Sequence, residues 1–239
     1  MQKRDYASAA QMFEKRIQCD PRSISSYLNG AASYMQVKNN ARARELLLKS
    51  LELYPEFLQG RLWLGRLYMI MDSLDQAKGQ YQQVLQIIGP NPEKKQLADA
   101  GEAYYYIGAY YFQTREYARA VESFKKAMSY GNDMSALHLQ LGQALLQMLD
   151  KKNDAAVNKR IVEESVKEIR RSVAVDPNNC QGHLWLAQGL VLSRVEGDDE
   201  ANKKLVEEAC GEYRKALRCD PGLKSDVMKG MERIGCQGK

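Results

Sequence analysis

A spacing of 34 residues recurs along this chain, and it constrains the fold more strongly than any single residue does. Pro21 and Pro55 lie 34 residues apart, and each follows a segment with helical patterning. Aromatic, small and aliphatic residues return at matching offsets. They are Tyr27, Gly30, Tyr34, Ala43 and Leu47, then Leu64, Gly65, Tyr68, Ala77, Tyr81 and Leu85, then Tyr104, Ile107, Gly108, Tyr111, Ala120, Phe124 and Ala127. A period in this range is typical of stacked helix–turn–helix repeats.

The sizes of the recurring residues give this spacing a physical reason. Small residues such as Gly65 and Ala77 stand where two antiparallel helices would approach closely, because a larger side chain would push the helices apart. Large residues such as Tyr68 and Tyr81 would fill the gaps to the next pair. One helix pair cannot bury its apolar face alone, so successive pairs must stack. The pattern therefore predicts an all-α solenoid.

The same residues give the chain a family resemblance. The pattern resembles the tetratricopeptide repeat family over nearly the whole sequence. This resemblance implies a right-handed α-solenoid of stacked helix–turn–helix repeats, forming a single domain over residues 1–239. A half-repeat at 1–23 would hold a second helix only. Complete repeats would begin near Ile24, Leu58, Gly101, Ser135 and Cys180.

The two ends of the predicted stack differ from complete repeats. The first helix carries an apolar stripe that the next repeat can cover only in part, made of Tyr6, Ala9, Ala10, Phe13 and Ile17. Either the natural protein continues upstream, or another chain supplies the cover. At the other end, a capping helix over 223–234 has Val227, Met231 and Ile234 on one face, with Ser225 as the expected N-cap.

Composition excludes several classes of protein. The chain is 44% hydrophobic and 27% charged, and no apolar run approaches the roughly 20 residues that a membrane span requires. The first residues enter a helical pattern without an apolar leader, so we expect a cytoplasmic protein or a fragment of a longer one. The net charge is +5, with nine Lys or Arg against four Asp or Glu in residues 1–50. This modest excess is typical of a solvated surface and disfavours nucleic acid as a partner.

The reactive residue types point away from metal sites and catalysis. The five cysteines are an odd number and form no CxxC motif, which disfavours disulfides and favours a reducing compartment. His138 and His183 share the repeat position that usually holds a packing aromatic, so we expect structural roles for both and no bound metal. The chain has no glycine-rich phosphate loop, nucleophile elbow or HExxH motif. We therefore expect neither an enzyme nor a cofactor.

Three departures from the period predict longer helices. About nine extra residues surround Pro90–Glu93, and the helix that contains Gly101 should begin early as a result. Insertions of 11 and 10 residues separate the two helices of the last two repeats. We expect single long helices over 153–175 and 198–219, with N-caps near Asn153-Asp154 and Asp198-Asp199. Two flexible loops are the alternative interpretation.

The resemblance also implies a binding groove along the first helices of successive repeats. The residues at groove-facing positions are Asn29, Trp63, Arg66, Tyr106, Gln113, Gln140, Gln143, Gln147, Gln181, Trp185 and Gln188. Such a groove would be rich in amides and aromatics, with Arg66 as its main charge, and this chemistry suits recognition. The alternative is that Trp63 and Trp185 pack between neighbouring helices.

One known specificity of the family does not fit. The subgroup that grips the acidic tails of chaperones uses Lys and Asn in one repeat, Asn in the next, and Lys and Arg in the third. The corresponding positions here hold Leu28 and Ala32, then Trp63, then Glu102 and Tyr106. A chaperone-tail role is therefore disfavoured.

These observations favour a non-enzymatic protein-interaction module that binds a peptide segment or a helix of a partner protein in its concave groove. A self-assembling scaffold, joined through the N-terminal half-repeat as a homo-oligomer, is a second interpretation. A substrate-recruiting arm of a larger enzyme is a third.

Overall fold

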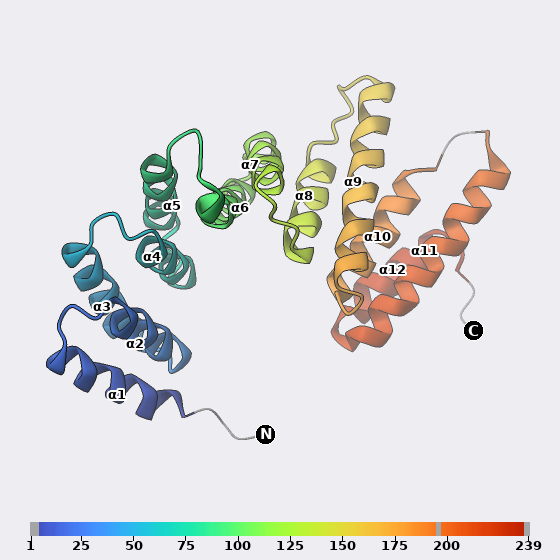
Figure 1. The fold of residues 1–239 in the computed structure, drawn as a ribbon. Coiled ribbons are helices and arrows are strands. Elements are labelled where there is room, and N and C mark those ends of the chain that lie inside the picture. The colour runs from blue at the N-terminus through green and yellow to red at the C-terminus, as the bar shows by residue number, and fades with distance from the viewer. Residues whose placement is uncertain (1–4, 195–196, 237–239) are drawn as a thin grey trace. The chain divides into compact units, whose positions relative to one another are not determined.

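The computed structural model describes residues 5–194 and 197–236, and every regular element in those ranges is a helix (Figure 1). The α-helices are α1 (Tyr6–Cys19), α2 (Ile24–Gln36), α3 (Asn40–Leu53), α4 (Leu58–Ile70), α5 (Leu74–Ile88), α6 (Leu97–Gln113), α7 (Tyr117–Ser129), α8 (Ser135–Gln147), α9 (Ala155–Val175), α10 (Cys180–Leu192), α11 (Asp199–Cys219) and α12 (Lys224–Arg233). Two 3-10 turns, η1 (Lys94–Gln96) and η2 (Pro221–Leu223), precede α6 and α12. The predicted all-α architecture is confirmed.

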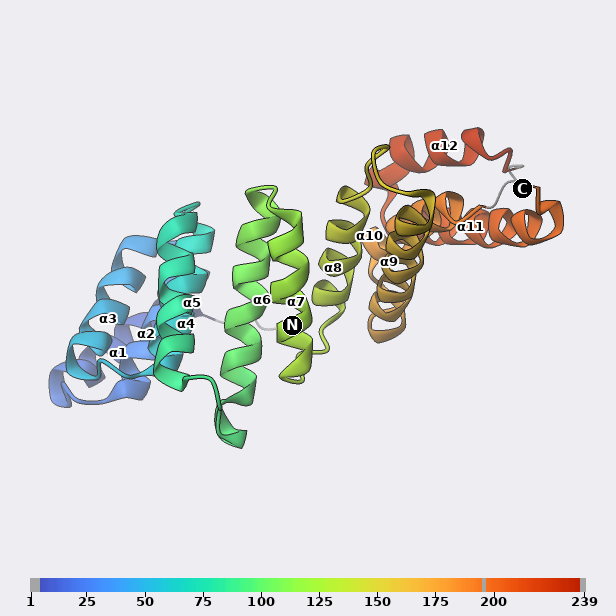
Figure 2. The ribbon, with the colours of Figure 1, turned by 90° about the horizontal axis from the view of Figure 1, so that it is seen from above.

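The chain consists of two compact units. Unit 1 comprises Met1–Tyr110 with Ser129–Gly131, and unit 2 comprises Tyr111–Met128 with Asn132–Lys239. Within unit 1, each helix from α1 to α5 packs against the next one along the chain. Within unit 2, the same succession runs from α8 to α12 (Figure 2). Both units are therefore stacks of antiparallel helix pairs.

Small residues set the close approach inside each pair, as the sequence predicts. A Cβ atom added to Gly65 on α4 would lie 2.6 Å from the ring of Tyr81 on α5, whose side chain is fully buried. In unit 2, a Cβ atom on Gly142 of α8 would collide with Ile169 of α9. Glycine is required at both positions because the second helix leaves no room for a larger residue.

The two insertions form long helices, so the flexible-loop alternative is wrong. Helices α9 and α11 each contain 21 residues, and α9 extends beyond α8 in Figure 1. The Asp154 carboxylate accepts a hydrogen bond from the amide of Ala156, and Asp198 does the same for Ala201. Each cap is one of the two residues predicted at that helix start. The first helix after the proline-rich turn also begins early, at η1 and α6.

The predicted cap on the last helix is wrong. Ser225 lies within α12, because the chain enters that helix through η2 rather than directly. The Asp220 side chain instead accepts a hydrogen bond from the amide of Gly222 at 2.8 Å. Val227 and Met231 are buried and Ile234 is partly buried, so the predicted apolar face of this helix is confirmed.

Disulfides overturn the expected state of the cysteines. Cys180 is bonded to Cys219, and Cys210 is bonded to Cys236, while Cys19 is free and exposed. The antiparallel pair α10–α11 brings the start of one helix beside the end of the other, across 39 residues of sequence. The argument for a reducing compartment therefore loses its support.

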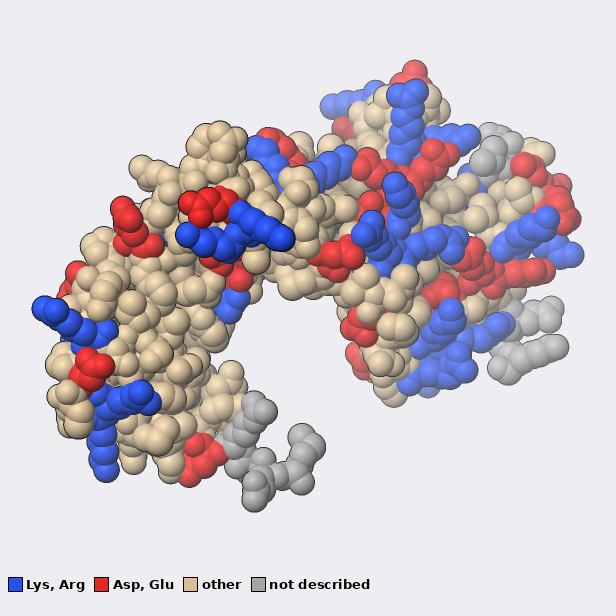
Figure 3. All heavy atoms as spheres, in the orientation of Figure 1, with Lys and Arg blue, Asp and Glu red and all other residues tan. Residues whose placement is uncertain are grey.

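The surface chemistry is mixed. On the face drawn in Figure 3, Lys and Arg side chains of unit 2 are interspersed with Asp and Glu. In the part of the chain that the structure describes, no helix is both long and apolar enough to cross a membrane.

Candidate functional site

The predicted groove residues fall into two sets, one in each unit. Unit 1 holds Asn29, Trp63, Arg66 and Tyr106, and unit 2 holds Gln113, Gln140, Gln143, Gln147, Gln181, Trp185 and Gln188. A single groove that runs through both units stays a prediction.

Helices α4 and α6 bring three of the four unit 1 residues together. Trp63 and Arg66 are three residues apart on α4, and Tyr106 lies four residues after Glu102 on α6, so each pair shares a helix face. The Arg66 guanidinium carbon lies 5.0 Å from the centroid of the Trp63 ring. Its Nη2 atom lies 2.5 Å from the Glu102 Oε1 atom. The side chains of Trp63, Arg66, Glu102 and Tyr106 are all half-buried. We call these four residues the α4–α6 cluster.

Tyr106 is held firmly in this cluster. Its ring stacks on that of Tyr81 at a centroid distance of 4.9 Å, and the Tyr105 ring meets it edge-on at 5.0 Å. The buried Tyr81 hydroxyl has no hydrogen-bond partner among the described residues, and burial raises the pKa of Tyr81. Tyr106 therefore presents a half-buried aromatic face on a rigid support.

The charge of this cluster is balanced. The Arg66 pKa is raised, because the attraction of Glu102 outweighs burial, which acts to lower the pKa. Arg66 therefore forms an ion pair within the cluster. Glu102 neutralises the positive charge of Arg66, which was expected to be the main charge of the groove. Gln59 donates a further hydrogen bond from α4 to Asp99 of α6 at 2.5 Å. Asn29 lies exposed on α2, and no hydrogen bond or ring contact joins it to this cluster among the described residues.

The unit 2 residues differ in accessibility. Gln113, Gln147 and Gln181 are exposed. Gln140, Gln143, Trp185 and Gln188 are half-buried. Trp185 packs against the apolar core of unit 2. Trp185 therefore contributes more to core packing than Trp63 does, because the ring face of Trp63 contacts the Arg66 guanidinium.

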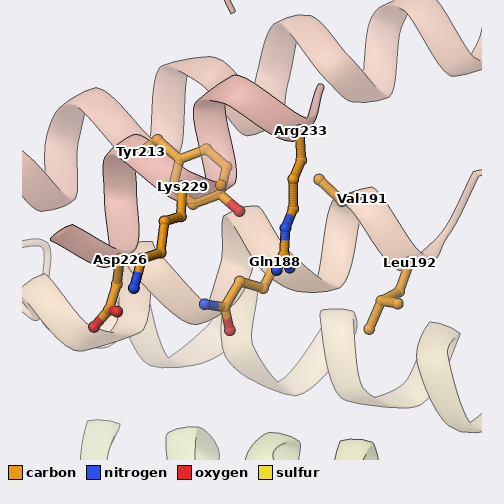
Figure 4. Close-up of a pocket in the computed structure, with 8 residues that line it drawn as sticks. Gln188, Val191, Leu192, Tyr213, Asp226, Lys229 and Arg233 are labelled. Atoms are coloured by element: carbon orange, nitrogen blue, oxygen red, sulfur yellow. The ribbon is translucent and has the colours of Figure 1, made fainter. Parts of the chain in front are cut away.

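One predicted residue, Gln188, lines a cavity of about 420 Å³ between α10, α11 and α12, which we call the cap pocket (Figure 4). Its lining comprises Gln188, Val191 and Leu192 of α10, Tyr213 of α11, and Asp226, Lys229, Gly230 and Arg233 of α12. A cavity of this size accommodates a few side chains of a peptide. In Figure 4, the Gln188 amide lies between the ends of the Lys229 and Arg233 side chains.

Close packing and a disulfide fix the walls of the cap pocket. A Cβ atom on Gly230 would lie 2.7 Å from the Cε1 atom of the Tyr213 ring, so α12 can approach α11 this closely only with glycine there. The Cys210–Cys236 disulfide ties the segment after α12 to α11. Burial raises the pKa of Tyr213, and the nearby Arg233 guanidinium partly offsets that rise.

Sequence reasoning missed the α12 side of this pocket. Lys229 and Arg233 lie on a helix that the repeat pattern treats only as a cap. A signal for Val191 and Leu192 was present, because they lie three and four residues after Gln188 and therefore share its helix face. The polar residues of α12 carried no comparable signal.

The histidines have structural partners, as expected. His138 Nδ1 lies 2.7 Å from a Glu168 carboxylate oxygen, and its Nε2 lies 2.6 Å from an Asp133 carboxylate oxygen. His183 Nδ1 lies 2.5 Å from the Glu212 carboxylate. Among the described residues, no group of three or more His, Cys, Asp or Glu is placed to hold a metal ion.

Comparisons with known proteins agree with this architecture. Residues 101–130 match the family model described as tetratricopeptide repeat. No curated protein sequence matches the chain.

Solved structures share the fold at low sequence identity. YrrB, described as a tetratricopeptide protein with an unusual peptide-binding site, is 18% identical over 94% of this chain and 100% of that one, with a TM-score of 0.61. The C-terminal part of a repeat protein from Cytophaga hutchinsonii is 17% identical over 96% of this chain and 81% of that one, with a TM-score of 0.63. PilF from Pseudomonas aeruginosa is 14% identical over 96% of this chain and 90% of that one, with a TM-score of 0.74.

Proposed function

We propose that this chain, which has the fold of tetratricopeptide-repeat proteins, is a non-enzymatic interaction module that binds an extended segment or a helix of a partner protein on the faces of its first helices. The observation that carries the proposal is the cap pocket. Gln188, selected by its repeat position, lines it together with Val191 and Leu192 of the same helix face. A residue that the repeat pattern predicts to face the groove therefore lines a cavity.

The α4–α6 cluster supports the same function. Trp63 and Tyr106 offer large, half-buried aromatic faces that are held by an ion pair and by ring stacking. Stiff aromatics with a polar handle bind partners at a low entropic cost, and they are frequent at interface hot spots. YrrB, which shares the fold, is described as having a peptide-binding site.

A selection from a random peptide library, followed by fluorescence anisotropy with a selected peptide, tests this proposal. We expect Gln188→Ala or Trp63→Ala to weaken binding by about 1–2 kcal/mol. Gln86→Ala is the matched control, because Gln86 is exposed on the second helix α5. If no peptide is enriched over a control without protein, the proposal is wrong.

The apolar surface of α1 favours self-assembly as a second candidate function. Met12 is 59% exposed, and the neighbouring Phe13 is only half-buried against α2. A second copy that covers this surface of α1 would bury both Met12 and Phe13. Sedimentation velocity at micromolar concentration should then show a dimer that Phe13→Ser converts to a monomer. A monomer at all concentrations would exclude this function.

A further inference from the structure

The cap pocket contains cations without an ion pair. Lys229 and Arg233 lie four residues apart on α12 and share one helix face. In the part of the chain that the structure describes, neither forms a salt bridge, although many other Lys and Arg side chains do. Asp226 is the single acidic residue among the lining residues. The pocket therefore has an excess of positive charge.

Hydrogen-bond donors line the cap pocket from two helices, α12 and α10. The Lys229 ammonium and the Arg233 guanidinium extend from α12 toward α10, and the Gln188 amide lies between them in Figure 4. An ammonium and a guanidinium can only donate hydrogen bonds, and an amide can also donate. Two cations on either side of an amide favour an anionic ligand such as a carboxylate, whose two oxygens accept charge-assisted hydrogen bonds.

Two aliphatic residues of α10 also line the pocket. Val191 and Leu192 follow Gln188 on α10, and the buried Tyr213 lines the pocket from α11. Leu192 is 51% exposed, so the pocket is open at this end and a bound chain can continue past it. This opening favours an internal peptide segment over a chain terminus. The exposed leucine and Val191 favour an aliphatic side chain next to the bound acid.

Resting on the proposed function, we infer that the cap pocket binds an acidic residue flanked by an aliphatic residue within an extended segment of the partner protein. Lys229, Arg233 and Gln188 hold the carboxylate. Val191 and Leu192 contact the aliphatic neighbour. The Cys210–Cys236 disulfide ties the segment after α12 to α11, so the backbone of the helix that carries Lys229 and Arg233 is held in place before the peptide arrives.

Random peptides displayed on phage at the N-terminus of a coat protein provide the test, because these peptides have no free C-terminus. Selection on the full chain should enrich Asp or Glu beside Leu, Ile or Val. A selected peptide, synthesised with both ends blocked, should bind about tenfold or more weakly when its acidic residue is replaced by the matching amide. Arg233→Gln and Lys229→Gln should weaken binding of the acidic peptide to a similar degree. Binding of the amide version should stay nearly unchanged.

Lys224→Gln is the matched control, because Lys224 is exposed on α12 but does not line the pocket. Enrichment of peptides without an acidic preference, with affinities insensitive to Arg233→Gln, would overturn this inference and leave the proposed function standing. Equal weakening by Lys224→Gln and Arg233→Gln would also overturn it, because only the net charge would then matter. The absence of any enriched peptide would instead contradict the proposed function itself.

Discussion

His138 on α8 and Glu168 on α9 form a buried pair, with 2.7 Å between the histidine Nδ1 atom and a glutamate carboxylate oxygen. The other ring nitrogen of His138 faces the carboxylate of Asp133 at 2.6 Å. Carboxylates accept hydrogen bonds, so both ring nitrogens must donate, and this arrangement selects the imidazolium form. His183 and Glu212 repeat the pairing between α10 and α11. Each long second helix of unit 2 is therefore joined to the first helix before it by a histidine and a glutamate.

This geometry predicts how stability depends on pH. Burial acts to lower the pKa of His138, but hydrogen bonds to Glu168 and Asp133 outweigh it and raise the pKa above the ordinary 6.5. A raised pKa contributes stability that is complete below about pH 6.5 and is lost as the pH rises through the folded-state pKa. The pKa of Glu168 is lowered by His138 from 4.5, so its contribution is lost as the pH falls through its own folded-state value.

The pair should therefore stabilise unit 2 most between about pH 4.5 and 6.5. Denaturant unfolding of His138→Gln should show a loss of about 3 kcal/mol near pH 6, because Glu168 remains buried without its partner, and a smaller loss near pH 8.5. The same loss at both pH values would contradict the charged pairing.

The disulfides give a prediction about folding stability. The Cys210–Cys236 bond closes a loop of 26 residues, so a double replacement by serine should lower the free energy of unfolding by about 3 kcal/mol under oxidising conditions. Cys19→Ser is the control and should change nothing, since Cys19 is free and exposed. Mass spectrometry after alkylation of the denatured, unreduced chain should find a single modified thiol. Alkylation of all five cysteines would contradict the pairing.

The repeat pattern predicted the helices because each of its positions reports a local packing requirement. Glycine is required at position 65 because the ring of Tyr81 leaves no room for a side chain there. Both residues belong to one repeat, so this requirement can be recognised within that repeat. The partner of Cys180 could not be recognised in this way, because 39 residues separate it from Cys219 and no motif connects them. The ion pair between Arg66 and Glu102 likewise could not be recognised within one repeat, since its side chains come from α4 and α6. The α12 wall of the cap pocket depends on how the last helix packs against α10 and α11.

The two tryptophans should respond differently to truncation. Trp185 packs against the core of unit 2, so Trp185→Ala should lower the free energy of unfolding by about 3 kcal/mol or more. Trp63 is half-buried under Arg66, and Trp63→Ala should lower it by about 1 kcal/mol while weakening peptide binding more strongly. Thermal melts of the two single variants test this contrast. A larger loss for Trp63 would identify that residue as core and remove it from the binding surface.

Amide chemical shifts of the isotope-labelled chain, titrated with a selected peptide, test the central claim most directly. The claim is that the partner is bound by faces of first helices and by the cap pocket. We predict that the largest shifts occur on α10 and α12 around Gln188, Lys229 and Arg233, with any second peptide contact on the α4–α6 cluster. Shifts confined to the solvent-exposed sides of the second helices α5, α9 and α11 would contradict the account.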